Sequence, residues 1–157
     1  MTSKTGALRT ALLLIVASLQ LSLARAQSVS GSGTTSTSLG WSPIYTYQFT
    51  VDAYKRKNGL VGGTIDLITT ISYIDTDPGD YTPYTTSEKY HVESLVVSGN
   101  QAIVQARGKS DRALHTFTFI DNSVGSVYPY YDYFGFDAAY TADPLPLRSG
   151  DITVVAQ

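Results

Sequence analysis

The chain contains no cysteine, only two histidines and no Asn-x-Ser/Thr triplet among its 157 residues. No disulfide can form, so burial of a core must hold the fold, and N-linked sugars are excluded. A Gly-x-Ser-x-Gly nucleophile motif is absent from the expected domain, as are a phosphate-binding glycine loop and closely spaced His or Cys pairs. We therefore predict that the protein is not an enzyme.

Acidic and basic residues are both sparse at the start of the chain, where an apolar run dominates. Lys4 and Arg9 precede this run, and Ala24-Arg25-Ala26 follows it, which is the pattern of a secretory signal peptide. A membrane span would need about 20 uninterrupted apolar residues, whereas polar residues at 18, 20 and 22 interrupt this run. We predict a signal peptide over residues 1–26, cleavage before Gln27, and a secreted, extracellular protein without a membrane span.

Removal of residues 1–26 would take away three of the eleven basic residues and none of the thirteen acidic ones. The remaining chain would carry a net charge of about −5, which repels phosphate backbones. Nucleic acid is therefore not expected as a partner.

Residues 27–40 are almost entirely Ser, Thr and Gly. Such a composition has little apolar surface to bury, so it predicts a flexible arm, either bare or carrying O-linked sugars. A single domain is then expected over residues 41–157.

Alternating polarity predicts strands throughout this domain. Residues 45–53 place aromatic or apolar side chains at every odd position, and Asn58-Gly59 follows as a hairpin turn. Further strand candidates lie at residues 90–97, 101–107 and 113–120, with Ser98-Gly99-Asn100 as a tight connection and a last strand after a Ser149-Gly150 turn. Sustained helical periodicity is absent after the signal peptide. Seven or eight strands at this spacing predict an all-β fold, either an antiparallel β-sandwich or a closed β-barrel.

The order of "FTVDA", "VGGTIDL", "SLVVSGNQAIVQARG", "HTFTFIDN", "DYFGF" and "GDITV" between Tyr45 and Val154 resembles small secreted all-β domains of the post-choice-of-anchor type. These occur in bacterial extracellular proteins, and the resemblance implies a sandwich or barrel without catalytic residues. The stretch "SLVVSGNQAIVQARG" also looks like dirigent-type and allene-oxide-cyclase-like barrels, which bind apolar small molecules, although their Gly-Gly-Thr-Gly turn is missing here.

The loop "DTDPGD" places Asp75, Asp77 and Asp80 within six residues. Calcium prefers several carboxylate oxygens on one loop, so these residues are a candidate calcium site. The residue order differs from common calcium loops, and Asp-Pro-Gly is also an ordinary turn. A solvated loop is the alternative.

The most aromatic stretch is "YPYYDYFGF", residues 128–136. As a strand it would place Asp132 and Phe134 on one face and Tyr131 and Tyr133 on the other. Rings on the first face suit a core, whereas hydroxyl-tipped rings on the second suit a partner. The candidate binding residues are therefore Tyr131 and Tyr133 with Asp132 or Asp137.

From these features we predict a monomeric extracellular binding module for a glycan or protein partner. The alternative is a small barrel that carries an apolar ligand. A lined interior cavity of about 300 Å³ or more would favour the alternative, and a filled core would favour the binding module.

Overall fold

The computed structural model describes residues 25–38, 43–73, 83–122, 131–139 and 143–156, and the regular structure among them is all β-strand. The strands are β1 (Arg25–Ser38), β2 (Ile44–Arg56), β3 (Val61–Ser72), β4 (Tyr84–Ser98), β5 (Gln101–Gly108), β6 (Leu114–Ile120), β7 (Tyr133–Phe136), β8 (Leu145–Pro146) and β9 (Ser149–Ala156). In these described ranges no helix is long and apolar enough to cross a membrane.

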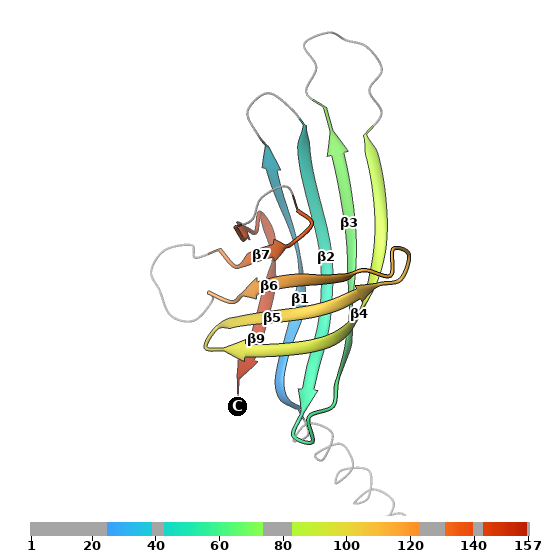
Figure 1. Cartoon of the computed structure of the whole chain (residues 1–157). Coiled ribbons are helices and arrows are strands. Elements are labelled where there is room, and N and C mark those ends of the chain that lie inside the picture. The colour runs from blue at the N-terminus through green and yellow to red at the C-terminus, as the bar shows by residue number, and fades with distance from the viewer. Residues whose placement is uncertain (1–24, 39–42, 74–82, 123–130, 140–142, 157) are drawn as a thin grey trace, which may run out of the picture.

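The nine strands form one antiparallel sheet in the order β8-β7-β6-β5-β4-β3-β2-β1-β9. From β1 to β8 each strand pairs with the next along the chain, and β9 returns to pair with β1. Figure 1 shows β1 to β4 as long neighbouring strands, with the shorter β5 to β7 lying across them, so the sheet curls on itself. Contacts of β8 with β1 and of β6 with β9 bring its two ends together as a half-barrel.

The predicted all-β antiparallel fold is confirmed for the described residues. The strand number differs from the predicted seven or eight, because residues 25–38 and the two-residue β8 also pair within the sheet.

Residues 27–38, predicted to be part of a flexible arm, instead form most of strand β1 between β2 and β9. The inward positions of β1 explain this difference. Val29 is fully buried and Thr35 is 1% exposed. At Gly33, an added Cβ would lie 2.8 Å from the Leu147 side chain and 3.1 Å from the Phe49 ring. Glycine is therefore needed here because large neighbours fill the space, and the folded unit begins before residue 41.

The core is lined by the alternating residues of β2 that the sequence predicted to face inward. Tyr47, Phe49, Val51 and Ala53 are all buried, and the residues between them are exposed. This period of two requires one dry and one wet face of the sheet.

Phenylalanine rings from the three strands β2, β6 and β7 fill the interior of the half-barrel. The Phe49 and Phe134 rings stack with centroids 4.4 Å apart, and Phe49 lies 5.6 Å from Phe119. Phe117 and Phe136 stack at 4.7 Å. Since each ring buries a large apolar area, this cluster provides much of the core energy that a disulfide-free domain needs.

The Asn58-Gly59 hairpin is confirmed. Gly59 has a φ of +85°, and its N–H donates to the Arg56 carbonyl at 2.9 Å. The Ser149-Gly150 turn is not formed, because both residues belong to β9 and pair with Thr34 and Gly33 of β1.

Candidate functional site

The curled sheet leaves a seam between β9 and the segments that flank β7. Two buried aspartates bridge it: an Asp132 Oδ2 accepts the N–H of Ile152 at 2.7 Å, and an Asp121 Oδ2 accepts the N–H of Val154 at 3.1 Å. Ile152 and Val154 are two residues apart on β9, so their N–H groups point to the same strand edge. The carboxylates therefore take the place of a neighbouring strand at this edge.

Further hydrogen bonds hold the segment that leads into β9. The N–H of Leu147 donates to the Asp132 carbonyl at 2.8 Å, and the N–H of Arg148 donates to the Thr34 carbonyl at 2.7 Å. The Thr35 hydroxyl donates to the Pro146 carbonyl at 2.7 Å. The backbone of residues 146–148 is thus fixed between β1 and Asp132, which positions the side chains that project from it.

Two adjoining surface pockets open along the seam, and we call them together the seam site. The first has a volume of about 250 Å³ and the second about 360 Å³. Tyr131, Leu147 and Arg148 line both of them. The first is completed by Asp132, Ser149, Gly150 and Asp151, and the second, called the Ser36 pocket, by Ser36 and Pro146.

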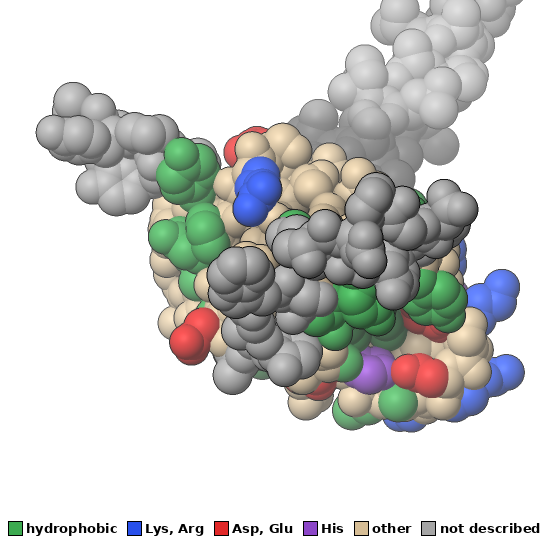
Figure 2. Space-filling model, turned by 90° about the horizontal axis from the view of Figure 1, so that it is seen from above, with side chains coloured by type: hydrophobic (Ala, Val, Ile, Leu, Met, Phe, Trp, Pro, Cys, Tyr) green, Lys and Arg blue, Asp and Glu red, His purple; other side chains and the backbone are tan. Residues whose placement is uncertain are grey.

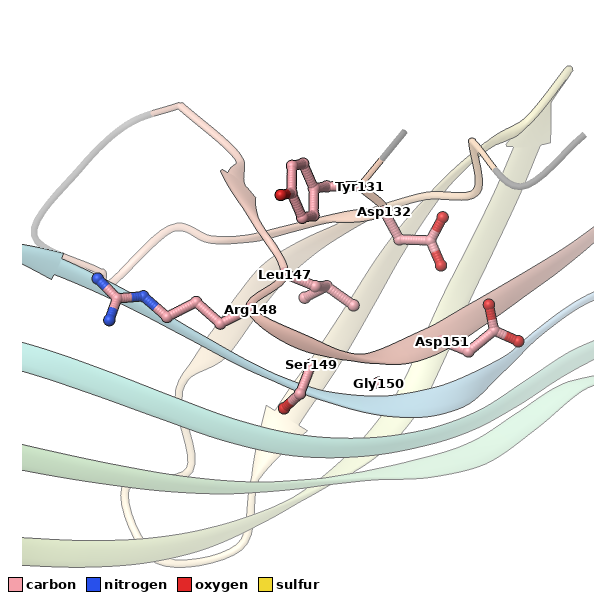
Figure 3. A pocket seen from close by; sticks show the side chains of 7 residues that line it. All are labelled: Tyr131, Asp132, Leu147, Arg148, Ser149, Gly150 and Asp151. Carbon is pink, nitrogen blue, oxygen red and sulfur yellow. The ribbon is translucent and has the colours of Figure 1, made fainter. Parts of the chain in front are cut away.

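The polar groups of the seam site are separated in space. Figure 3 shows Arg148, just before β9, and Asp151, in β9, extending in opposite directions, with the Tyr131 ring above Leu147. Neither charged side chain forms an ion pair with another described residue. The Ser36 Oγ is buried, yet it has no hydrogen-bond partner within the described part of the chain. The site thus offers an exposed ring, a cation and a carboxylate.

The structure does not bring the four predicted binding residues together at one site. Tyr131 and Asp132 line the seam site, and the Tyr131 side chain is 53% exposed. Asp132 is only 6% exposed, and its carboxylate accepts backbone N–H groups from both Asn122 and Ile152. Tyr133 and Asp137 line neither pocket.

Asp137 instead takes part in a cluster around His115. The His115 Nδ1 lies 3.0 Å from an Asp137 oxygen, and the Nε2 lies 2.8 Å from an Asp111 oxygen. Burial lowers the pKa of His115, but the two carboxylates raise it by more, so the net shift is upward. The bond to His115 lowers the pKa of Asp111. Burial, together with the charges of Glu88, Asp111 and Asp137, raises the pKa of Tyr90 to about 12.

The arrangement around His115 is that of an imidazolium with both N–H groups donated to carboxylates. The remaining oxygens are also used, since Asp111 accepts the N–H of Ala113 and Asp137 accepts the N–H of Thr116. The cluster therefore ties the β5–β6 turn to the end of β7, and it leaves no free base for chemistry.

The predicted calcium ligands Asp75, Asp77 and Asp80 lie outside the described residues. Within the described ranges, no group of three or more His, Cys, Asp or Glu side chains could hold a metal ion.

Ser36, Arg148 and Asp151 are lining residues that the sequence did not predict. Ser36 belongs to the segment predicted to be an arm, and Arg148 and Asp151 flank the predicted turn. Alternating Leu145 and Leu147 are a local sign that this segment packs against something. No local pattern links it to Tyr131, because the curl of the sheet makes that contact.

Searches against protein-family models, curated proteins and solved structures gave no match for this chain. The resemblances to post-choice-of-anchor domains and to dirigent-type barrels stay predictions.

Proposed function

We propose that the protein is a secreted, monomeric, non-catalytic β domain that binds an extracellular partner, with carbohydrate as the leading ligand class, at the seam site. One observation carries this proposal. The exposed Tyr131 ring lies beside Leu147, with hydrogen-bonding groups on either side of them. An apolar floor with a few fixed polar groups is typical of a ligand site, and the flat face of a sugar ring fits an aromatic side chain of this kind.

The state of the polar groups supports binding rather than catalysis. The Asp132 carboxylate in the seam site already accepts two backbone N–H groups. Both nitrogens of His115 are bonded to carboxylates, and this histidine does not line the site. Asp132 is nearly buried and holds the backbone of β9, so its described role is structural, and His115 lies outside the reach of a ligand in the site.

The predicted cleavage of a signal peptide is compatible with the pairing of β1 in the sheet. Cleavage before Gln27 would keep the whole β1–β9 ladder, whose first pair is Gln27 with Ala156. A monomeric state agrees with the sheet edges, because β8 has two residues and carboxylates cover part of the β9 edge. Short or covered edges disfavour strand pairing between molecules.

The alternative function is that of a small apolar-ligand carrier of the dirigent or allene-oxide-cyclase-like type. Two observations favour it: Tyr84 and Tyr73 are 62% and 53% exposed, and Figure 2 shows hydrophobic side chains gathered on the upper face. The neighbouring rings of Phe49, Phe117 and Phe134 weigh against it, because they occupy the interior that an apolar ligand would need.

A glycan array with the parent protein and two variants tests the proposal. We expect binding by the parent, loss of that binding in Tyr131→Ser, and unchanged binding in Tyr84→Ser, which removes an exposed ring elsewhere. Repeating the array with calcium removed tests the predicted role of the 75–80 loop. Equal loss in both tyrosine variants would place the ligand away from the seam site, and binding of an apolar dye instead of glycans would favour the alternative.

A further inference from the structure

The positive and negative side chains of the seam site lie apart, and this separation limits the kind of sugar that can bind. We propose that it recognises a saccharide bearing a carboxylate, a uronate, with the carboxylate in the Ser36 pocket and the sugar hydroxyls in the first pocket. This inference rests on the proposed function, and it adds the chemistry of the ligand and its orientation.

The Ser36 pocket is suited to an anion. Arg148 is the charged residue among its described lining residues, and none of these residues carries a carboxylate. The guanidinium is a planar fork that bonds a carboxylate through two parallel N–H groups.

The first pocket is suited to neutral hydroxyl groups. Asp132 and Asp151 line it, and both would repel a second anion placed there. Asp151 is exposed, and its oxygens can accept hydrogen bonds from sugar hydroxyls, while the Ser149 hydroxyl can donate or accept. Because Arg148 and Asp151 extend in opposite directions, a uronate has one favourable orientation across the Tyr131 ring.

The overall charge of the protein limits the ligand further. A chain with a net charge of about −5 after loss of residues 1–26 repels a long polyanion at low salt. The geometry therefore favours one uronate unit at a time, with the attraction limited to the contact with Arg148.

Calorimetric titration of the full chain with three trisaccharides tests this inference. The probes are a galactose trisaccharide that carries a single galacturonate residue, its carboxyl-reduced neutral form and a singly sulfated galactose trisaccharide. We expect the uronate probe to bind at least about tenfold more tightly than the neutral one, as for a charge-assisted pair of hydrogen bonds. Arg148→Gln should abolish this preference, and Arg148→Lys should keep part of it.

Lys57→Gln is the matched control, since it removes one positive charge from the exposed β2–β3 turn. It should leave all three affinities unchanged, and thermal melting should show that each variant is folded. If Arg148→Gln does not fold, Arg148→Lys decides the question. Equal affinity for the uronate and neutral probes, or tighter binding of the sulfated one, would overturn this inference and leave the proposed function standing. Failure of the parent to bind any of the probes, and any sugar on the glycan array, would contradict both.

Discussion

The two faces of residues 131–136 differ in what they contact, although both are rich in aromatic rings. On the inward face, Phe134 is 1% exposed and stacks on Phe49, and Asp132 bonds the edge of β9. On the outward face, Tyr131 is half exposed and lines the seam site. The side chains of this six-residue segment thus separate, by alternation alone, into a part that holds the fold and a part that is available to a partner.

This difference shows that aromatic content does not decide between a core and a binding surface. A ring that is buried against other rings contributes to the free energy of unfolding, whereas an exposed ring gains its contacts only on association. Substitutions on the two faces should therefore separate stability from binding, and the expected effects on stability fall into a clear order.

The largest loss of stability is expected for Phe134→Ala. This substitution leaves a cavity between Phe49, Phe117 and Phe119, whose ring centroids lie 4.4 to 6.3 Å from that of Phe134. The free energy of unfolding should fall by about 3 to 5 kcal/mol, measured by denaturant titration. Val96→Ala, at an exposed position, should change it by less than about 0.5 kcal/mol. A Phe134→Ala protein as stable as the parent would mean that the ring stack is not part of the core.

The next largest loss is expected for Asp132→Ala. It would leave the N–H groups of Ile152 and Asn122 without their acceptor in a nearly dry environment, at a cost of about 2 to 3 kcal/mol. Hydrogen exchange of the Ile152 amide should also become faster, because the seam opens there. Asp151→Ala removes a neighbouring but exposed carboxylate and should change neither quantity. Similar behaviour of the two variants would show that the seam does not depend on Asp132.

A smaller, pH-dependent change in the free energy of unfolding is expected from His115. This residue contacts Phe136, at the end of the inward face, and bonds Asp137. The folded-state pKa of His115 is raised, so its contribution to stability is complete below the unfolded pKa of about 6.5 and is lost as the pH rises through the folded pKa. The lowered pKa of Asp111 acts in the opposite direction, because that contribution is lost on acidification.

Melting temperatures between about pH 5 and about pH 9 measure this effect. We expect the parent to lose stability on the alkaline side, and we expect His115→Gln to flatten that slope. His91→Gln changes an exposed histidine of β4 and serves as the control that keeps the slope. A parent with no slope in this range would show that the His115 cluster does not change its charge there.

The sequence predicts these contrasts wherever a strand has one wet and one dry face. The alternation of Tyr47, Phe49 and Val51 in β2 and the inward direction of Phe134 follow from period two alone. The Asn58-Gly59 turn was predictable because few residue pairs adopt its backbone angles.

Strand β1 and the seam site were not predictable in the same way. The composition of residues 27–38 suggests a flexible arm, because few of these residues are apolar. Composition does not show that Gly33 leaves room for the Phe49 ring and the Leu147 side chain. The proximity of Tyr131 to Arg148 depends on the curl of the whole sheet, which no short pattern encodes. Local chemistry thus predicts the faces of strands, and long-range packing decides which faces meet.

The smallest change in stability is expected for Tyr131→Ser combined with Tyr133→Ser, on the outward face. Tyr131 is half exposed and Tyr133 partly exposed, so the melting temperature should shift by no more than a few degrees. Sugar binding should nevertheless be lost, because the ring that covers Leu147 in the seam site is gone. The single variants separate the contributions of the two tyrosines to sugar binding. Tyr131→Ser should account for the loss of binding, since Tyr133 does not line the site. A double variant that unfolds would mean that both faces of residues 131–136 belong to the core, because only rings that are buried in the free protein can cost that much stability when they are removed.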